Sequence, residues 1–154
     1  MLKAFHNRMR DDKGFTLIEL MVVVLIIAIL IAIAIPTFLG MRRRAQDRAA
    51  QSDLRNGYTA AKAFFTDGET YTGFTDAVAT ESEPSLDWVD GAPTVDTREV
   101  GIDDGTTGTT VRLLRFSQSG TVFCIQEVAG VPGYGSDEGG DLAAAEGACN
   151  GAEW

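Results

Sequence analysis

The chain has 154 residues, an apolar fraction of 45% and a formal net charge of -9. This length allows one domain with a modest core. The acidic balance argues against a broad phosphate-binding surface, because nucleic acid would be repelled, so nucleic acid is not expected as the primary ligand.

Residues 1–14 are short, charged and without an apolar core of their own, and we interpret them as a leader peptide. The single histidine, His6, lies in this leader. A chain without the leader would have no imidazole for nucleophilic catalysis or for a metal site, and the sequence holds no phosphate loop. We therefore do not expect an enzyme.

An apolar helix is predicted next, and it is long enough to cross a membrane. No charged side chain occurs from Leu20 to Met41, a stretch that as a helix reaches about 33 Å, roughly the hydrocarbon thickness of a bilayer. Glu19 stands at the start of this segment, although a charge within an apolar helix costs up to about 3 kcal/mol. Pro36 removes one backbone donor and is predicted to kink or locally weaken the helix.

The same helix is predicted to continue as an amphipathic segment. Leu54, Tyr58, Ala61 and Phe65 recur at helical spacing and form one stripe. We assign the whole helix to residues 15–66, with a membrane or assembly segment at about 15–41 and an amphipathic half at 42–66. Asp67-Gly68 should end it. The basic residues Arg42, Arg43 and Arg44 suit either a solvated stop after a membrane span or a contact with anionic lipid.

Residues 67–154 are predicted to form a β-rich globular part. A long segment with scattered turn residues is followed by two strands, 110–117 and 121–129, joined as a hairpin through the sequence QSG. A third strand is expected near 94–102. The last 25 or so residues are rich in Gly and acids, and such a tail would be floppy unless it were pinned.

Two cysteines lie in this part, Cys124 and Cys149. In an exported protein a disulfide is the default expectation, whereas in the cytosol they would be two free thiols. A disulfide would pin the tail to a strand and contribute about 3 kcal/mol.

Gly14 followed by FTLIEL, a run of aliphatic residues and then Pro36 resembles the start of a type IV prepilin. The resemblance covers roughly residues 9–66. It implies an α+β fold, in which a long N-terminal helix packs on a small antiparallel sheet with a Cys pair near the chain end. It also implies that prepilin peptidase cuts between Gly14 and Phe15 and then N-methylates Phe15.

The family likeness also implies a location and partners. A pilin precursor waits in the inner membrane as a single-pass protein, and the pilus assembly machinery then packs it into an extracellular homo-oligomeric filament. Motility, adhesion and DNA uptake all stay open as uses of such a filament. By resemblance, the helix melts near the position of Pro36 in the filament, giving an extensible link. The other interpretation is that Pro36 only bends the helix.

For Glu19 we hypothesise a role in register during assembly. Cleavage would create an amine on Phe15, and the Glu19 carboxylate of one subunit could pair with the amine of the next. A subunit inserted out of step would leave a buried charge unpaired. Pairing between Glu19 and its own amine is the competing arrangement.

Two further interpretations stay open. The first is a pseudopilin of type II secretion or competence, although Thr72 stands where those proteins carry a YP motif. The second is a membrane-anchored binding domain that never polymerises, with an ordinary secretory signal or an uncleaved anchor. Neither an ordinary signal nor a plain anchor explains Glu19.

Four acidic residues beside glycines are weak calcium candidates: Asp103, Asp104, Asp137 and Glu138. No other cofactor is expected. Such acidic loops are more often simply solvated. Four aromatic residues could serve adhesion or fill the small core: Tyr71, Trp88, Tyr134 and Trp154.

Overall fold

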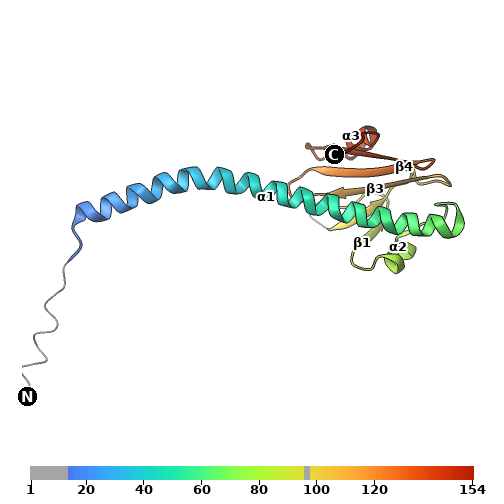
Figure 1. Cartoon of the computed structure of the whole chain (residues 1–154), viewed down its shortest axis with the longest axis horizontal. Coiled ribbons are helices and arrows are strands. Elements are labelled where there is room, and N and C mark those ends of the chain that lie inside the picture. Colours follow the sequence, from blue (N-terminus) through green and yellow to red (C-terminus); the bar gives the residue numbers. More distant parts are fainter. Residues whose placement is uncertain (1–13, 96–97) are drawn as a thin grey trace, which may run out of the picture. The chain divides into compact units, whose positions relative to one another are not determined.

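The computed structural model describes residues 14–95 and 98–154 (Figure 1). The chain divides into two compact units, which we call the N-terminal unit (Met1–Gly40) and the head unit (Met41–Trp154). Of the predicted leader, all but Gly14 lies outside the described residues. One long helix, α1 (Leu17–Gly68), contains both the apolar and the amphipathic stretch and ends at Gly68, as the Asp67-Gly68 pair predicted. Pro36 lies inside α1 without interrupting it.

The head unit carries a five-stranded sheet with strand order β1-β2-β3-β4-β5. The first pair is parallel and the other three pairs are antiparallel, so the expected α+β fold is confirmed (Figure 1). Its strands are β1 (Asp87–Asp90), β2 (Glu99–Ile102), β3 (Thr110–Phe116), β4 (Val122–Val128) and β5 (Val131–Asp137). Two short helices complete it, α2 (Asp76–Ser82) and α3 (Leu142–Ala148).

The predicted hairpin is confirmed as β3 and β4, paired in register from Thr110 with Val128 to Phe116 with Val122. Its turn is closed by the Ser117 N–H, which donates to the Thr121 carbonyl at 2.7 Å. The third expected strand is β2, which is shorter than the predicted range. The Gly-rich tail, for which the sequence predicted no strand or helix, contains β5 and α3.

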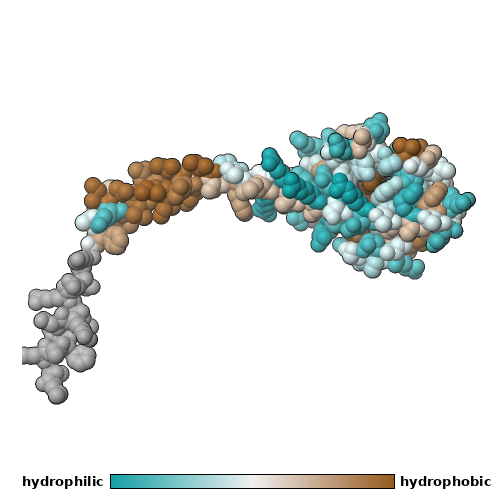
Figure 2. All heavy atoms as spheres, viewed as in Figure 1, coloured by the Kyte–Doolittle hydropathy of each residue, from teal (hydrophilic) through white to brown (hydrophobic). Residues whose placement is uncertain are grey.

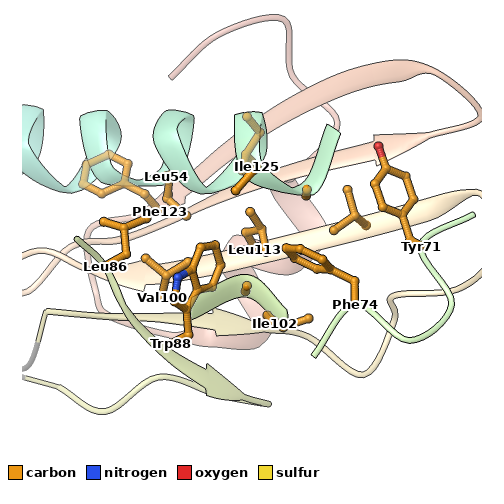
Figure 3. Close-up of a cluster of buried hydrophobic side chains, with 14 of the residues drawn as sticks. Leu54, Tyr71, Phe74, Leu86, Trp88, Val100, Ile102, Leu113, Phe123 and Ile125 are labelled. Carbon is orange, nitrogen blue, oxygen red and sulfur yellow. The ribbon is translucent and has the colours of Figure 1, made fainter. Parts of the chain in front are cut away.

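The main core lies between the second half of α1 and one face of the sheet (Figure 3). Leu54 and Ala61 are fully buried, and Tyr58 and Phe65 pack at the edge of the cluster, which confirms the predicted stripe. Gly57 lies on the same face, and a Cβ added there would be 2.9 Å from Cη2 of Trp88. The helix can therefore approach the indole this closely only because residue 57 has no side chain.

The four aromatic residues separate into two groups. Tyr71 and Trp88 are buried in the core, so they fill it and are not surface residues (Figure 3). Trp154 is partly buried and packs edge-on against Tyr134 and Phe123, with ring centroids 4.8 Å and 6.1 Å away. The end of the chain is thus attached to the sheet.

Candidate functional site

The N-terminal unit exposes almost all of its apolar surface. Every large aliphatic side chain from Leu17 to Met41 is about half exposed or more. Figure 2 shows this segment as an almost continuous hydrophobic surface. By length and composition this part of α1 can cross a membrane. So much exposed apolar area must be covered by lipid or by other protein.

Glu19 and Thr16 form a reciprocal cap at the start of α1. The Thr16 backbone N–H and hydroxyl both donate to Oε2 of Glu19, at 2.9 and 2.6 Å, and the Glu19 N–H donates to the Thr16 hydroxyl at 3.2 Å. This is a capping box, which satisfies backbone donors that would otherwise lack partners at a helix start. The capping-box sequence TLIE therefore explains why the helix begins at Leu17.

The cap lies beside the predicted processing site. Gly14 and Phe15 precede the first turn of α1 and are both exposed. Phe15, Ile18, Glu19, Val22 and Val23 line a shallow, mostly apolar hollow of about 410 Å³. The Glu19 carboxylate thus borders an apolar surface, and a partner charge would be only weakly screened there once lipid or another helix covered that surface.

A buried acid fastens the amphipathic half of α1 to the sheet. Glu127 on β4 is 1% exposed, and its carboxylate accepts hydrogen bonds from the hydroxyls of Tyr58 and Tyr71. Lys62 donates to the same carboxylate at 2.9 Å and forms an ion pair with it. Two partners come from α1 and one from the segment that follows it, so the cluster fixes the helix on the sheet.

The charge of Glu127 is favoured despite its position. Burial by itself raises the pKa of this carboxyl, but hydrogen bonds from Tyr58, Lys62 and Tyr71 outweigh it and hold the pKa below its ordinary value. Burial and the Glu127 carboxylate in turn raise the pKa values of Tyr58 and Tyr71. The two tyrosines therefore stay protonated and act as donors.

A second helix-to-sheet contact joins Asp53 on α1 to Arg115 on β3. Arg115 is buried, and its guanidinium forms a hydrogen-bonded ion pair with the Asp53 carboxylate. Arg98 lies 3.6 Å from the same carboxylate. Burial lowers the pKa of Arg115, since the charged form loses its contact with water.

The calcium candidates do not converge. Asp103 forms an ion pair with Arg112 at 2.8 Å, and Asp137 accepts a hydrogen bond from the Asp141 N–H at 2.8 Å. Within residues 14–95 and 98–154, no group of three or more His, Cys, Asp or Glu side chains is placed to hold a metal ion. Asp103 and Asp137 are thus engaged in local structure.

Cys124 and Cys149 form a disulfide that joins β4 to the end of α3. The bond pins the Gly-rich tail to the sheet, as expected for an exported protein. Gly133 and Gly135 on β5 lie directly against the end of α3, and a Cβ at either would be 2.5 Å from backbone atoms of Ala148 or Cys149. These glycines allow the end of α3 to pack on β5.

The prokaryotic N-terminal methylation motif matches residues 9–35 of the chain. Over 67 residues the chain is 46% identical to the type IV major pilin protein PilA of Myxococcus xanthus. This aligned region covers 44% of this chain and 30% of that protein. It is 36% identical over 105 residues to the type IV major fimbrial protein FimA of Dichelobacter nodosus, covering 66% of this chain and 62% of the relative.

A shorter similarity leads to a secretion protein. The type II secretion system core protein G of Vibrio cholerae is 42% identical over 48 residues, 31% of this chain and 33% of the relative. The chain thus spans from about a third to somewhat under two thirds of the length of these relatives. No solved structure matches it significantly. The methylation motif, the pilin relatives and the helix-and-sheet fold together support the type IV pilins as the family of this chain.

Proposed function

We propose that the chain is a structural subunit of a type IV pilus. The observation that carries this proposal is the exposed apolar half of α1, which begins at Leu17 within the Thr16–Glu19 capping box, just after Gly14 and Phe15. A soluble globular protein would bury such a surface. A subunit that is first held in lipid and then packed against other helices has a use for it.

The methylation motif supports processing of the chain. In the proposed order of events, prepilin peptidase cleaves after Gly14 and methylates the new amine of Phe15. The precursor sits in the inner membrane through α1 with the head unit outside the cytoplasm, where the Cys124–Cys149 bond is stable. The pilus assembly machinery then transfers it into a surface filament.

In the filament, apolar area supplies affinity and Glu19 supplies register. Each Å² of apolar surface that is removed from water contributes about 25 cal/mol. The capping box occupies Oε2 of Glu19, and a carboxylate has about four acceptor positions, so it can also receive the ammonium of a neighbouring Phe15. An out-of-step subunit leaves that charge without a partner.

A pseudopilin of type II secretion is the second candidate, favoured by the similarity to core protein G. That similarity covers 31% of this chain, whereas the similarity to the fimbrial protein FimA covers 66% and therefore includes more of the head unit. The pilus subunit is the better supported of the two.

The test is to shear filaments from the surface of cells that express the chain and to measure the mass of the N-terminal peptide. We expect abundant sheared protein that begins at methylated Phe15. Protein that begins at methylated Phe15 but stays in the cell envelope indicates a pseudopilin. Protein that keeps residues 1–14 contradicts both.

A further inference from the structure

The head unit contains a cavity with an excess of positive charge that the proposed function leaves unexplained. It has a volume of about 480 Å³ and lies between α1, the residue just before β2 and the end of β3. Its polar lining consists of Arg42, Gln46, Arg98, Arg115, Ser117 and Gln118. Three arginines therefore line one hollow in a chain whose net charge is -9.

Among the residues that the structure describes, the charge of these arginines is only partly balanced. Asp53 pairs with both Arg115 and Arg98 and so supplies one negative charge to two cations. Arg115 is 4% exposed, and its Nε finds no hydrogen-bond acceptor among the residues that the structure describes. A buried donor without an acceptor is costly, and a bound anion would reduce the excess of positive charge around it.

The sequence indicates where such an anion is encountered. Arg42 is the first charged residue after the run from Leu20 to Met41. In a precursor held in the membrane through that run, Arg42 lies in the headgroup layer, where the phosphate groups of phospholipids are within reach of its guanidinium. A guanidinium presents paired N–H donors that fit two oxygens of a phosphate group.

We propose that this cavity binds a phosphate group, supplied by an anionic phospholipid headgroup or by free phosphate. The inference rests on the membrane-anchored stage of the proposed function and not on filament formation. Arg42 and Arg98 are exposed and available to the phosphate, while Arg115 forms the charged back wall. In the lipid case, the headgroup holds the base of the head unit at the membrane until the subunit is extracted.

The first experiment uses the full chain in a neutral detergent with inorganic phosphate as the probe. Titration is followed through the arginine Nε–H resonances by NMR. We expect a saturable shift of the Arg115 resonance. Arg42→Gln and Arg98→Gln should each weaken binding about tenfold, since each removes a charged hydrogen-bond donor. Arg48→Gln, an exposed arginine of α1 outside the cavity, is the matched control and should leave it unchanged.

The second experiment identifies the source of the phosphate. The full chain is placed in bilayer nanodiscs of phosphatidylcholine alone or mixed with phosphatidylglycerol. A shift of Arg115 in the mixed lipid that is lost in Arg42→Gln assigns the site to the headgroup. A shift with inorganic phosphate but not with the mixed lipid assigns it to free phosphate.

Two results overturn the proposal. One is an Arg115 resonance unmoved by phosphate and by lipid alike, or moved equally in all three variants. The other is a shift that follows protein concentration but not phosphate, which indicates an acidic side chain of a second copy in the cavity. Because these measurements use the unassembled chain, either result leaves the filament proposal intact.

Discussion

Tyr71 donates a hydrogen bond of 2.9 Å to Oε1 of Glu127, and both residues are fully buried in the head unit. Glu127 also holds Lys62 and Tyr58 of α1. The amphipathic half of the helix is therefore joined to the sheet through a charged carboxylate as well as through apolar packing. This contact makes the stability of the head unit depend on pH.

Because the pKa of Glu127 in the folded state is lowered, its stabilisation is fully present above the unfolded value of about 4.3 and is lost as the pH falls through the folded value. We expect Glu127→Gln to lower the free energy of unfolding by about 1–3 kcal/mol at neutral pH. The difference from the wild type should shrink below about pH 4. Denaturant unfolding followed by tryptophan fluorescence in detergent measures both, since Trp88 and Trp154 both lie in the head unit.

Glu81→Gln changes an exposed acid of α2 and is the control for this series. It should leave the unfolding free energy within about 0.5 kcal/mol of wild type. A constant difference between Glu127→Gln and wild type across the acid range would contradict the assignment of the charge.

Gly57→Ala should destabilise the head unit. Alanine favours a helix by about 1 kcal/mol over glycine, but the new methyl would lie 2.9 Å from the ring of Trp88 inside the core. Overpacking of this kind costs about 1–3 kcal/mol, so we expect a net loss in the unfolding midpoint. Asn56→Ala, at the exposed neighbouring position, should raise the midpoint slightly, and a gain from Gly57→Ala would show that the indole moves freely.

Removal of the disulfide should loosen the chain end. Replacing Cys124 and Cys149 by Ala opens a loop with a sequence separation of 25 and should cost about 3 kcal/mol. Hydrogen exchange of the full chain in detergent should be faster in the variant than in the wild type for β5 and α3, because both lie beside this bond. Exchange in β2 should be the same in the two proteins. Equal protection of β5 in both proteins would mean that glycine packing alone holds the tail.

Thr16→Ala and Glu19→Gln separate the two roles of the first turn. Thr16→Ala removes the capping hydroxyl but keeps the acid, and it should cost about 1 kcal/mol of local helix stability with filaments still formed. Glu19→Gln keeps an oxygen acceptor but removes the charge, so the amine of a neighbouring Phe15 would be buried without a partner. We therefore expect the amount of sheared filament to fall to a few per cent or less of the wild-type amount. Equal filament yield from the two variants, measured by quantitative blotting, would refute the register hypothesis.

Periodicity was sufficient to predict the parts of the fold with strong side-chain patterns. The helical spacing of Leu54 and Ala61 placed one face of α1 in the core, and the aliphatic runs placed β3 and β4. Strand β5 was missed because its sequence VPGYGSD contains proline and two glycines, which disfavour strands by propensity. Those glycines are there because the backbone near Cys149 approaches them closely, and that approach is a tertiary contact.

Two polar features were missed although local signals existed. Thr16 and Glu19 match the capping-box spacing directly before an apolar run. Glu127 shares strand parity with the buried Phe123 and Ile125, which places it on the core face of β4. Its partners Tyr58 and Tyr71 come from 69 and 56 positions away, so no local pattern could have identified them.

The capping hydrogen bonds at the start of α1 join Thr16 to Glu19, and both residues follow the Gly14–Phe15 bond. Proteolysis at the Gly14–Phe15 bond would therefore release a mature chain whose first helical turn is already nucleated. The new amine of Phe15 would then lie two residues before the start of α1, next to this capped turn.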